Sequence, residues 1–170
     1  MIKLASLAAI FAMALGGTAS AKADEAADRV AIHELLLAYG STLDNRDFAG
    51  FSALFGADGV YVAGGGAEVK GPETGALMER ILTESPRARR RPNFHLLFNE
   101  AITILGPDRA RATSMGMFMV PAIGTGRIEV SSVARYEDEL VKVNGRWLFA
   151  RRKVVGISGP PAEPAEPVKP

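Results

Sequence analysis

The chain has 170 residues, no cysteine and a formal net charge of +1, with 48% hydrophobic and 23% charged residues. Without cysteine, disulfides, thiol catalysis and cysteine-bound metal sites are excluded. The near-neutral charge provides no broad field for nucleic acid or for a membrane surface, so neither is expected as a partner.

The first residues are typical of a secretory signal peptide. The basic start MIK precedes the apolar run LASLAAIFAMALGG, which is too short for a membrane span. Small-x-small motifs at 19–21 and 21–23 predict cleavage after Ala21 or Ala23; an uncleaved anchor helix is the alternative. We therefore expect residues 1–21 to be removed, leaving a periplasmic or secreted protein that does not associate with a membrane.

Three helices are predicted next. The first starts near 24–28 and carries an amphipathic stripe at offsets 0, 3, 4, 7 and 11, formed by Ile32, Leu35, Leu36, Tyr39 and Leu43. A short second helix follows Asp47, a plausible N-cap. After a strand that ends in a glycine loop, the third helix opens at 71–72 with a proline and an acidic first turn.

The remainder of the domain is predicted to be β-structure. Four strands, at 93–105, 109–121, 127–143 and 147–157, are separated by the turn GPD, the loop AIGTG and the hairpin turn NGR. Helices gathered on one side of a curved, mostly antiparallel sheet make an α+β fold in which the bent sheet can enclose a pocket. The domain is expected over 24–157, with a proline-rich, disordered tail at 158–170.

The strand that begins near residue 93 carries a histidine in an apolar environment. Alternation places Phe94, Leu96 and Phe98 on one face and His95, Leu97 and Asn99 on the other. A histidine and an asparagine on one face indicate either a wet surface or the lining of a cavity. The other histidine, His33, flanks the helical stripe and is expected to be partly exposed.

His95, Asp44 and Tyr39 together suit acid–base chemistry. An imidazole that faces a cavity can exchange a proton near neutral pH. Asp44 follows the first helix and could fix the imidazole tautomer, while Tyr39 lies a little over one turn earlier and could polarise a carbonyl group. The alternative is a structural pair in which Asp44 holds His95, and with it the sheet, to the helix.

Three segments also carry a family resemblance: LLLAYGSTLDNRDFAGFSALFGADGVYV, FHLLFN and ARYEDELVKVNGRWLFARRKV. Over roughly residues 25–156 the chain resembles the SnoaL-like branch of the NTF2-like superfamily. That group includes scytalone dehydratase, bile acid 7-alpha-dehydratase, polyketide cyclases and ketosteroid isomerase. The resemblance implies a cone-shaped fold, in which a curved sheet wraps over three N-terminal helices.

The resemblance also implies site residues. Tyr39, Asp44 and His95 look like the tyrosine, aspartate and histidine of bile acid dehydratase and are the expected catalytic residues. Tyr61 is the candidate for the second tyrosine position of scytalone dehydratase. Tyr61 is therefore expected to contact a substrate, and Asn99 is expected to do so because it shares the strand face of His95.

Phe98 and Met115 are the expected apolar contacts of that substrate. The dehydratases place a further acid or histidine on the strand after the histidine strand, where this chain offers only Thr113 and Ser114 as polar residues. This departure favours a binding module over an enzyme. The loop at 85–92 carries four arginines at the expected mouth of the cavity, either to capture a ligand carboxylate or phosphate or as a solvated basic loop.

These observations predict an exported, cofactor-free lyase or isomerase with dehydratase-like chemistry. Its substrate is expected to be a small hydrophobic carbonyl compound, such as a polyketide-like or steroid-like molecule. The alternative is a non-catalytic periplasmic ligand-binding or assembly module with the same pocket. No cofactor and no metal are expected, and a homodimer or homotrimer is expected because one face of such a sheet commonly needs a partner.

Overall fold

The computed structural model describes the backbone of residues 8–157 and the side chains of residues 22–157. Two helices come first, two strands and a third helix follow, and the last four elements are strands. The helices are α1 (Ala8–Asp44), α2 (Phe48–Ser52) and α3 (Thr74–Glu84), with a 3-10 turn at Gly71–Glu73 before α3. The strands are β1 (Phe55–Val62), β2 (Glu68–Lys70), β3 (Phe94–Gly106), β4 (Arg109–Pro121), β5 (Ile128–Val143) and β6 (Arg146–Gly156).

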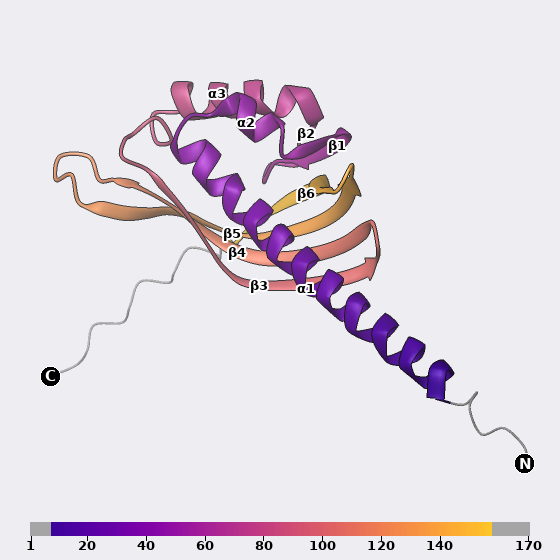
Figure 1. The fold of residues 1–170 in the computed structure, drawn as a ribbon. Coiled ribbons are helices and arrows are strands. Elements are labelled where there is room, and N and C mark those ends of the chain that lie inside the picture. Colours follow the sequence, from indigo (N-terminus) through magenta and orange to yellow (C-terminus); the bar gives the residue numbers. More distant parts are fainter. Residues whose placement is uncertain (1–7, 158–170) are drawn as a thin grey trace, which may run out of the picture.

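The strands form one curved sheet in the order β2-β1-β6-β5-β4-β3. All neighbours are antiparallel except β1 and β6, which run parallel. Figure 1 shows α1 crossing one face of the sheet, with α2 and α3 closing the end near β1 and β2. The α+β architecture expected from the sequence is therefore confirmed.

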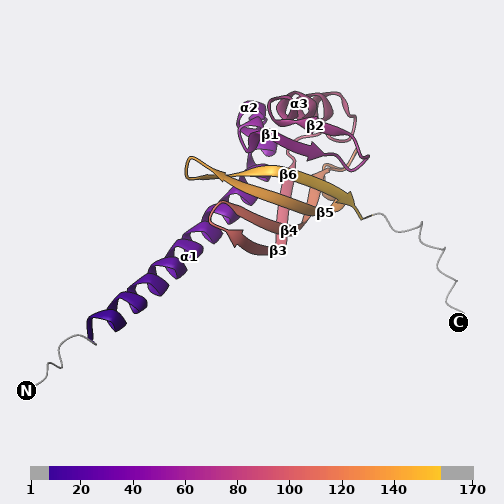
Figure 2. The same ribbon diagram turned by 90° about the vertical axis from the view of Figure 1, so that its right-hand side faces the viewer.

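The apolar stripe of α1 forms the centre of the core. All five stripe residues are buried: Ile32, Leu35, Leu36, Tyr39 and Leu43. The helix itself begins earlier than expected, at Ala8, and Figure 2 shows its N-terminal part projecting beyond the strands. Among the described side chains of α1, Asp28 is the first that bonds another element, accepting from Lys142 Nζ at 2.6 Å and from Trp147 Nε1 at 2.9 Å. The helix is thus anchored to the β5–β6 hairpin from Asp28 onward.

Two short-range expectations are confirmed by the local geometry. The Asp47 side chain caps α2 by accepting the backbone N–H of Gly50 at 2.8 Å. The hairpin between β5 and β6 turns at Asn144 and Gly145, whose φ angles are +50° and +78°. Positive φ at both central residues is the twist that a two-residue hairpin turn requires, and asparagine followed by glycine adopts it most easily.

Strand β3 lies at the edge of the sheet, and α1 covers its free side. The Asp44 carboxylate accepts the backbone N–H of His95 at 2.9 Å near one end of the strand. Arg29 Nη1 donates to the carbonyl of Ile102 at 2.8 Å near the other end. Because an uncovered edge strand invites pairing with other chains, these bonds both position the helix and protect the edge.

The outermost segments bear on two expectations. The proline-rich tail at 158–170 lies outside the described residues, as do the side chains of the expected signal peptide at 1–21. Within the part of the chain that the structure describes, no helix has the length and hydropathy that a membrane crossing requires.

Candidate functional site

The end of α1 delivers Asp44 to the edge of the sheet. The helix closes with Arg46 in the left-handed region, at a φ of +60°. The backbone N–H of Asp47 bonds the carbonyl of Thr42 at 2.8 Å, and the N–H of Arg46 bonds the carbonyl of Leu43 at 3.1 Å. This pair of bonds is the Schellman motif, which usually has glycine where Arg46 stands. The sharp stop leaves the Asp44 side chain in the last turn, facing β3.

Asp44 binds His95 and Asn93 through three hydrogen bonds. Its Oδ1 atom lies 2.6 Å from His95 Nδ1 and accepts the Asn93 amide at 2.7 Å, while Oδ2 accepts the His95 backbone N–H. A carboxylate can only accept, so Nδ1 carries the proton. In the neutral ring the lone pair is therefore on Nε2, which is the tautomer that a general base needs.

The His95 ring lies at the wall of a cavity, with its side chain 11% exposed. It packs against Phe118 with ring centroids 4.6 Å apart and meets Tyr39 edge-on at 6.3 Å. Gly40 makes this approach possible, because a Cβ atom there would lie 3.1 Å from both the Cβ and the carbonyl oxygen of His95. The helix and the strand can therefore come close enough for Asp44 to reach the ring.

The cavity has a volume of about 190 Å³ and lies between the helices and the inner face of the sheet. Most of its wall is apolar, as is usual for small-molecule sites. The lining residues come from α1, β1, α3 and its following loop, and β3 to β6; those that matter below are Tyr39, Leu43, Tyr61, Ala88, His95 and Tyr136. The structure thus brings Tyr39, Tyr61 and His95 together around one space.

Three tyrosines provide further polar groups of the cavity wall. The hydroxyls of Tyr39 and Tyr61 lie 3.4 Å apart, and the rings of Tyr39 and Tyr136 meet with centroids 5.4 Å apart. Burial raises the pKa of Tyr61 to about 12 and the pKa values of Tyr39 and Tyr136 well above their ordinary range. All three phenols therefore stay protonated at neutral pH and can donate hydrogen bonds into the cavity.

A buried cation lies behind these tyrosines. Arg152 is 0% exposed, and its guanidinium carbon lies 4.0 Å from the Tyr39 ring centre and 4.2 Å from that of Tyr136. Asp138 Oδ2 approaches Arg152 Nη1 at 3.6 Å. Burial raises the pKa of Asp138 to about 6, against the opposing charge of Arg152. Arg152 therefore places a positive charge behind the phenols, which stabilises negative charge developing near them most strongly below about pH 6, where Asp138 is protonated.

The sequence pattern does not identify Arg152, because strict alternation from Phe149 would turn Arg151 inward. The structure has an irregularity here: Leu140 pairs with Phe149, whereas Glu139 pairs with Arg151, so Ala150 has no partner on β5. The extra residue is a β-bulge, which reverses the facing of all later side chains. No local pattern in the sequence marks this bulge.

Three of the expected substrate contacts lie elsewhere. Phe98 and Met115 pair across β3 and β4 on the opposite face of the sheet, and neither lines the cavity. Asn99 is exposed, with a φ of +52°, in a bulge where Asn99 and Glu100 face a single residue of β4. Strict alternation along β3 predicts that Asn99 lies beside His95, but the bulge turns its side chain out of that row. The expectation that these three residues contact a cavity ligand is therefore corrected.

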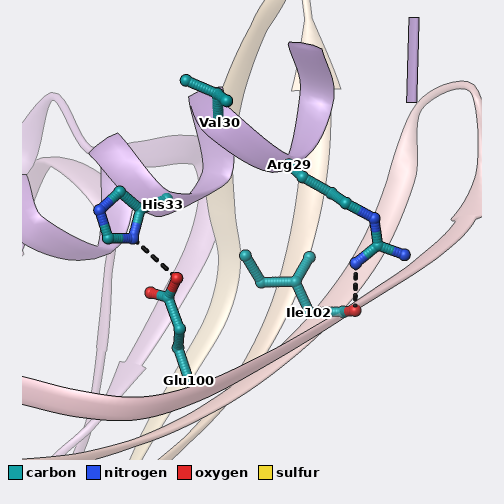
Figure 3. A pocket seen from close by; sticks show the side chains of 5 residues that line it. All are labelled: Arg29, Val30, His33, Glu100 and Ile102. Carbon is teal, nitrogen blue, oxygen red and sulfur yellow. Dashed lines mark hydrogen bonds and ion pairs between the residues drawn. The ribbon is translucent and has the colours of Figure 1, made fainter. Parts of the chain in front are cut away.

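The second histidine forms a similar pair in a different setting. His33 Nδ1 lies 2.7 Å from Glu100 in an open groove between α1 and β3, which has a volume of about 440 Å³ (Figure 3). Its side chain is 46% exposed. In the same view Arg29 reaches down to the carbonyl of Ile102, so these polar contacts join the helix to the edge strand. The groove is larger than the cavity at His95, but its histidine is screened by water.

The described side chains also bear on metal binding. Among residues 22–157, no three His, Cys, Asp or Glu side chains converge as a metal site would require. The polar groups that do converge are one imidazole, its carboxylate and three phenols, which move protons and donate hydrogen bonds.

Comparison with known proteins places this geometry in a family. A model of the SnoaL-like domain family matches residues 24–153. An NTF2-like protein with a cystatin-like fold from Novosphingobium aromaticivorans is 24% identical; 84% of this chain and 90% of that chain are covered, with a TM-score of 0.71. No curated protein matches the sequence significantly.

Two further solved structures bear the names of elimination enzymes. A candidate scytalone dehydratase from Novosphingobium aromaticivorans is 19% identical, covers 87% of this chain and 99% of its own, and has a TM-score of 0.67. A hexachlorocyclohexane dehydrochlorinase from Novosphingobium barchaimii is 18% identical. The match covers 88% of this chain and 99% of that chain, with a TM-score of 0.65. At this identity the likenesses establish a shared fold.

Proposed function

Because the chain belongs to the SnoaL-like domain family, we propose that it is a cofactor-free lyase or isomerase with His95 as its general base. The observation that carries this proposal is the Asp44–His95 pair at the wall of a mostly apolar cavity that three protonated tyrosines also line. The substrate is a small hydrophobic carbonyl compound, such as a polyketide-like or steroid-like molecule. The name of the candidate scytalone dehydratase supports elimination chemistry on this fold.

The proposed reaction begins with removal of a proton from the carbon next to a carbonyl group. His95 Nε2 takes the proton, and the electron pair of the C–H bond moves onto the carbonyl oxygen. Asp44 stabilises the imidazolium, while the hydroxyls of Tyr39 and Tyr61 donate to the developing oxyanion. When the next carbon carries a hydroxyl group, the electron pair returns, the C–O bond breaks and the imidazolium proton leaves with the hydroxyl as water.

A ligand-binding module remains the second candidate function. The specific observation in its favour is the wall that β4 contributes, where Gly116 and Phe118 line the cavity in place of a further acid or base. With one proton-transfer pair, the site can remove and return a proton but has no separate acid for a leaving group other than the tyrosines.

Exchange of α-protons in deuterated buffer separates the two functions. We expect the protein to accelerate deuterium uptake by the ketone 2-tetralone, followed by proton NMR, and His95→Gln to lower that acceleration by about 10²–10⁴-fold. His33→Gln is the matched control, because it removes the other carboxylate-paired histidine and should leave exchange unchanged. Binding of 2-tetralone without any acceleration by the native protein would favour the binding module.

We also infer that residues 1–21 direct export to the periplasm or the medium. Both expected cleavage positions precede Asp28, from which α1 bonds the β5–β6 hairpin, so cleavage spares this anchor. Mass spectrometry of protein from the exported fraction should find a chain that begins at Lys22 or Asp24. A cytoplasmic protein that retains its first residues would contradict export.

A further inference from the structure

The segment at 85–93 forms the rim of the cavity and is fixed there at two points. Ala88 is buried and lines the cavity. Asn93 is buried and donates its side-chain amide to Asp44 at 2.7 Å. Four arginines, at positions 87 and 89–91, flank Ala88 or lie between these anchors, so the segment that carries them is held at the cavity wall.

Two of the four arginines attach the rim to the sheet. Arg90 donates to the carbonyl of Pro121 at 2.5 Å and to Glu129 at 3.2 Å. Arg87 reaches the carbonyl of Ser131 at 3.5 Å, one residue before Ser132 of the cavity wall. Arg90, with its carboxylate partner, therefore has a structural role.

Arg89 and Arg91 are different. Both are exposed, and within residues 22–157 neither has a hydrogen bond or ion pair to another side chain. The sequence from Ser85 to Asn99 contains no acidic residue that could compensate them.

Arg46 adds a third positive charge at the same place. Its guanidinium donates to the carbonyls of two cavity-lining residues, Leu43 at 2.8 Å and Ala88 at 3.5 Å. Burial lowers the pKa of Arg46, and the charge of Arg91 lowers it further, whereas Asp44 opposes this effect. Arg46, Arg89 and Arg91 together outnumber the single carboxylate of Asp44, so the rim carries an excess of positive charge.

We propose that the cavity ligand carries a carboxylate, which Arg89 and Arg91 bind at the rim while its apolar, carbonyl-bearing part enters the cavity. This inference rests on the proposed function in that both require a ligand in this cavity. Arginine suits the task because its planar group of donors matches a carboxylate, and such charge-assisted bonds are the stronger ones. The native substrate would then be a keto acid or a similar carbonyl compound with an acidic group.

A pair of matched ligands tests the inference directly. The acid 4-oxo-4-phenylbutanoate and its neutral amide share a ketone, a ring and a shape, and they differ in the carboxylate. We expect the acid to bind about tenfold more tightly by calorimetry at low salt. We also expect this preference to shrink in about 300 mM NaCl, because salt screens exposed charges.

The double variant R89Q/R91Q should reduce the preference for the acid to about twofold or less while leaving amide binding unchanged. R109Q/R146Q is the matched control: both arginines are exposed, they lie next to the β3–β4 and β5–β6 turns, and the net charge changes equally. It should keep the full preference. Equal losses in the two double variants would overturn the role of the rim arginines.

The remaining outcomes separate this inference from the proposed function. Equal binding of acid and amide by the native protein would overturn the carboxylate and leave the proposed chemistry standing. Failure of both compounds, and of 2-tetralone, to bind would remove both proposals. If inorganic phosphate displaces the acid far better than acetate does, the rim binds phosphate groups and the carboxylate assignment is overturned.

Discussion

Asp44 contacts His95 twice: one carboxylate oxygen lies 2.6 Å from the ring Nδ1 and the other accepts the backbone N–H at 2.9 Å. The first contact orients the imidazole, and the second fixes the edge strand at the end of α1. One side chain therefore serves both as the partner of a proposed base and as part of the fold. Its two roles can be separated by changing its charge while keeping its shape.

We expect Asp44→Asn to lower proton exchange by about 10²–10⁴-fold, because an amide can donate to Nδ1 and thereby place the ring proton on Nε2. The free energy of unfolding should fall by about 1–3 kcal/mol, since the variant weakens bonds to His95 and Asn93. Exchange kinetics and urea denaturation measure the two effects. Glu100→Gln alters the equivalent pair of His33 in the open groove. A similar loss of exchange in that variant would contradict the assignment of His95 as the base.

The hydroxyl pair of Tyr39 and Tyr61 yields a second prediction. Removing either hydroxyl with phenylalanine should lower exchange by about tenfold to a hundredfold, because one oxyanion donor is lost. The fold-loss of exchange in the double variant should be smaller than the product of the two single losses, because the two hydroxyls are neighbours and their effects are coupled. Unchanged exchange in Tyr39→Phe, with intact folding by circular dichroism, would exclude the proposed role.

The same tyrosines predict the alkaline side of the pH profile. Burial raises the pKa of Tyr61 to about 12 and that of Tyr39 above its ordinary range, so both remain donors when ordinary tyrosines ionise. Exchange should therefore show no decline from tyrosine ionisation as the pH rises to about 10. A decline near pH 10 that disappears in Tyr61→Phe would contradict this assignment.

Asp138 should make stability depend on pH. Burial raises the pKa of its carboxyl from 3.8 to about 6, so the folded protein binds this proton more tightly than the unfolded chain. The contribution to stability is then fully present below about pH 4 and is lost as the pH rises through about 6.

Asp138→Asn isolates this effect because an amide does not titrate in that range. Between about pH 4.5 and pH 7.5, the native protein should lose about 2 kcal/mol of unfolding free energy relative to the variant. Urea denaturation at several pH values gives the comparison. Asp108→Asn, at an exposed turn position, is the control. Its free energy of unfolding should change with pH in the same way as that of the native protein.

The outer side of the sheet predicts self-association. Three apolar rows cross β3, β4 and, in part, β5; their members are Phe94, Met119, Val130, Leu96, Met117, Val133, Phe98 and Met115. Phe94, Leu96 and Val130 are exposed, and contiguous apolar patches of this kind often mark interfaces. The homodimer or homotrimer expected from the sequence stays a prediction, and this apolar sheet face is where we place it.

Light scattering after size exclusion should therefore find an oligomer. Leu96→Lys should shift it to monomer, because a charge would be buried in the contact. Thr113→Lys lies on the same side of the sheet, next to the charged residues Arg111, Glu137 and Lys153, and is the control. A native protein that is monomeric at high concentration would contradict the prediction.

The sequence alone predicted what depends on short-range patterns. The stripe of α1 follows from residues three and four apart, the cap of α2 from Asp47, and the last hairpin from Asn144 and Gly145. Asp44 and His95 could also be proposed as a pair, because a carboxylate at a helix end can reach a histidine on an apolar strand. These features arise from the bonds and contacts that a residue makes with its near neighbours in the chain.

Only the tertiary structure decided which side chains share the cavity. Two extra residues, one near Asn99 on β3 and one at Ala150 on β6, reverse the alternation of their strands, so Asn99 turns outward and Arg152 turns inward. A bulge forms where the packing of the whole sheet against α1 makes it favourable, and a residue's near neighbours do not encode that packing. The sequence by itself determined the elements and the proposed base, whereas the long-range pairing of strands decided that Arg152 lies buried behind Tyr39.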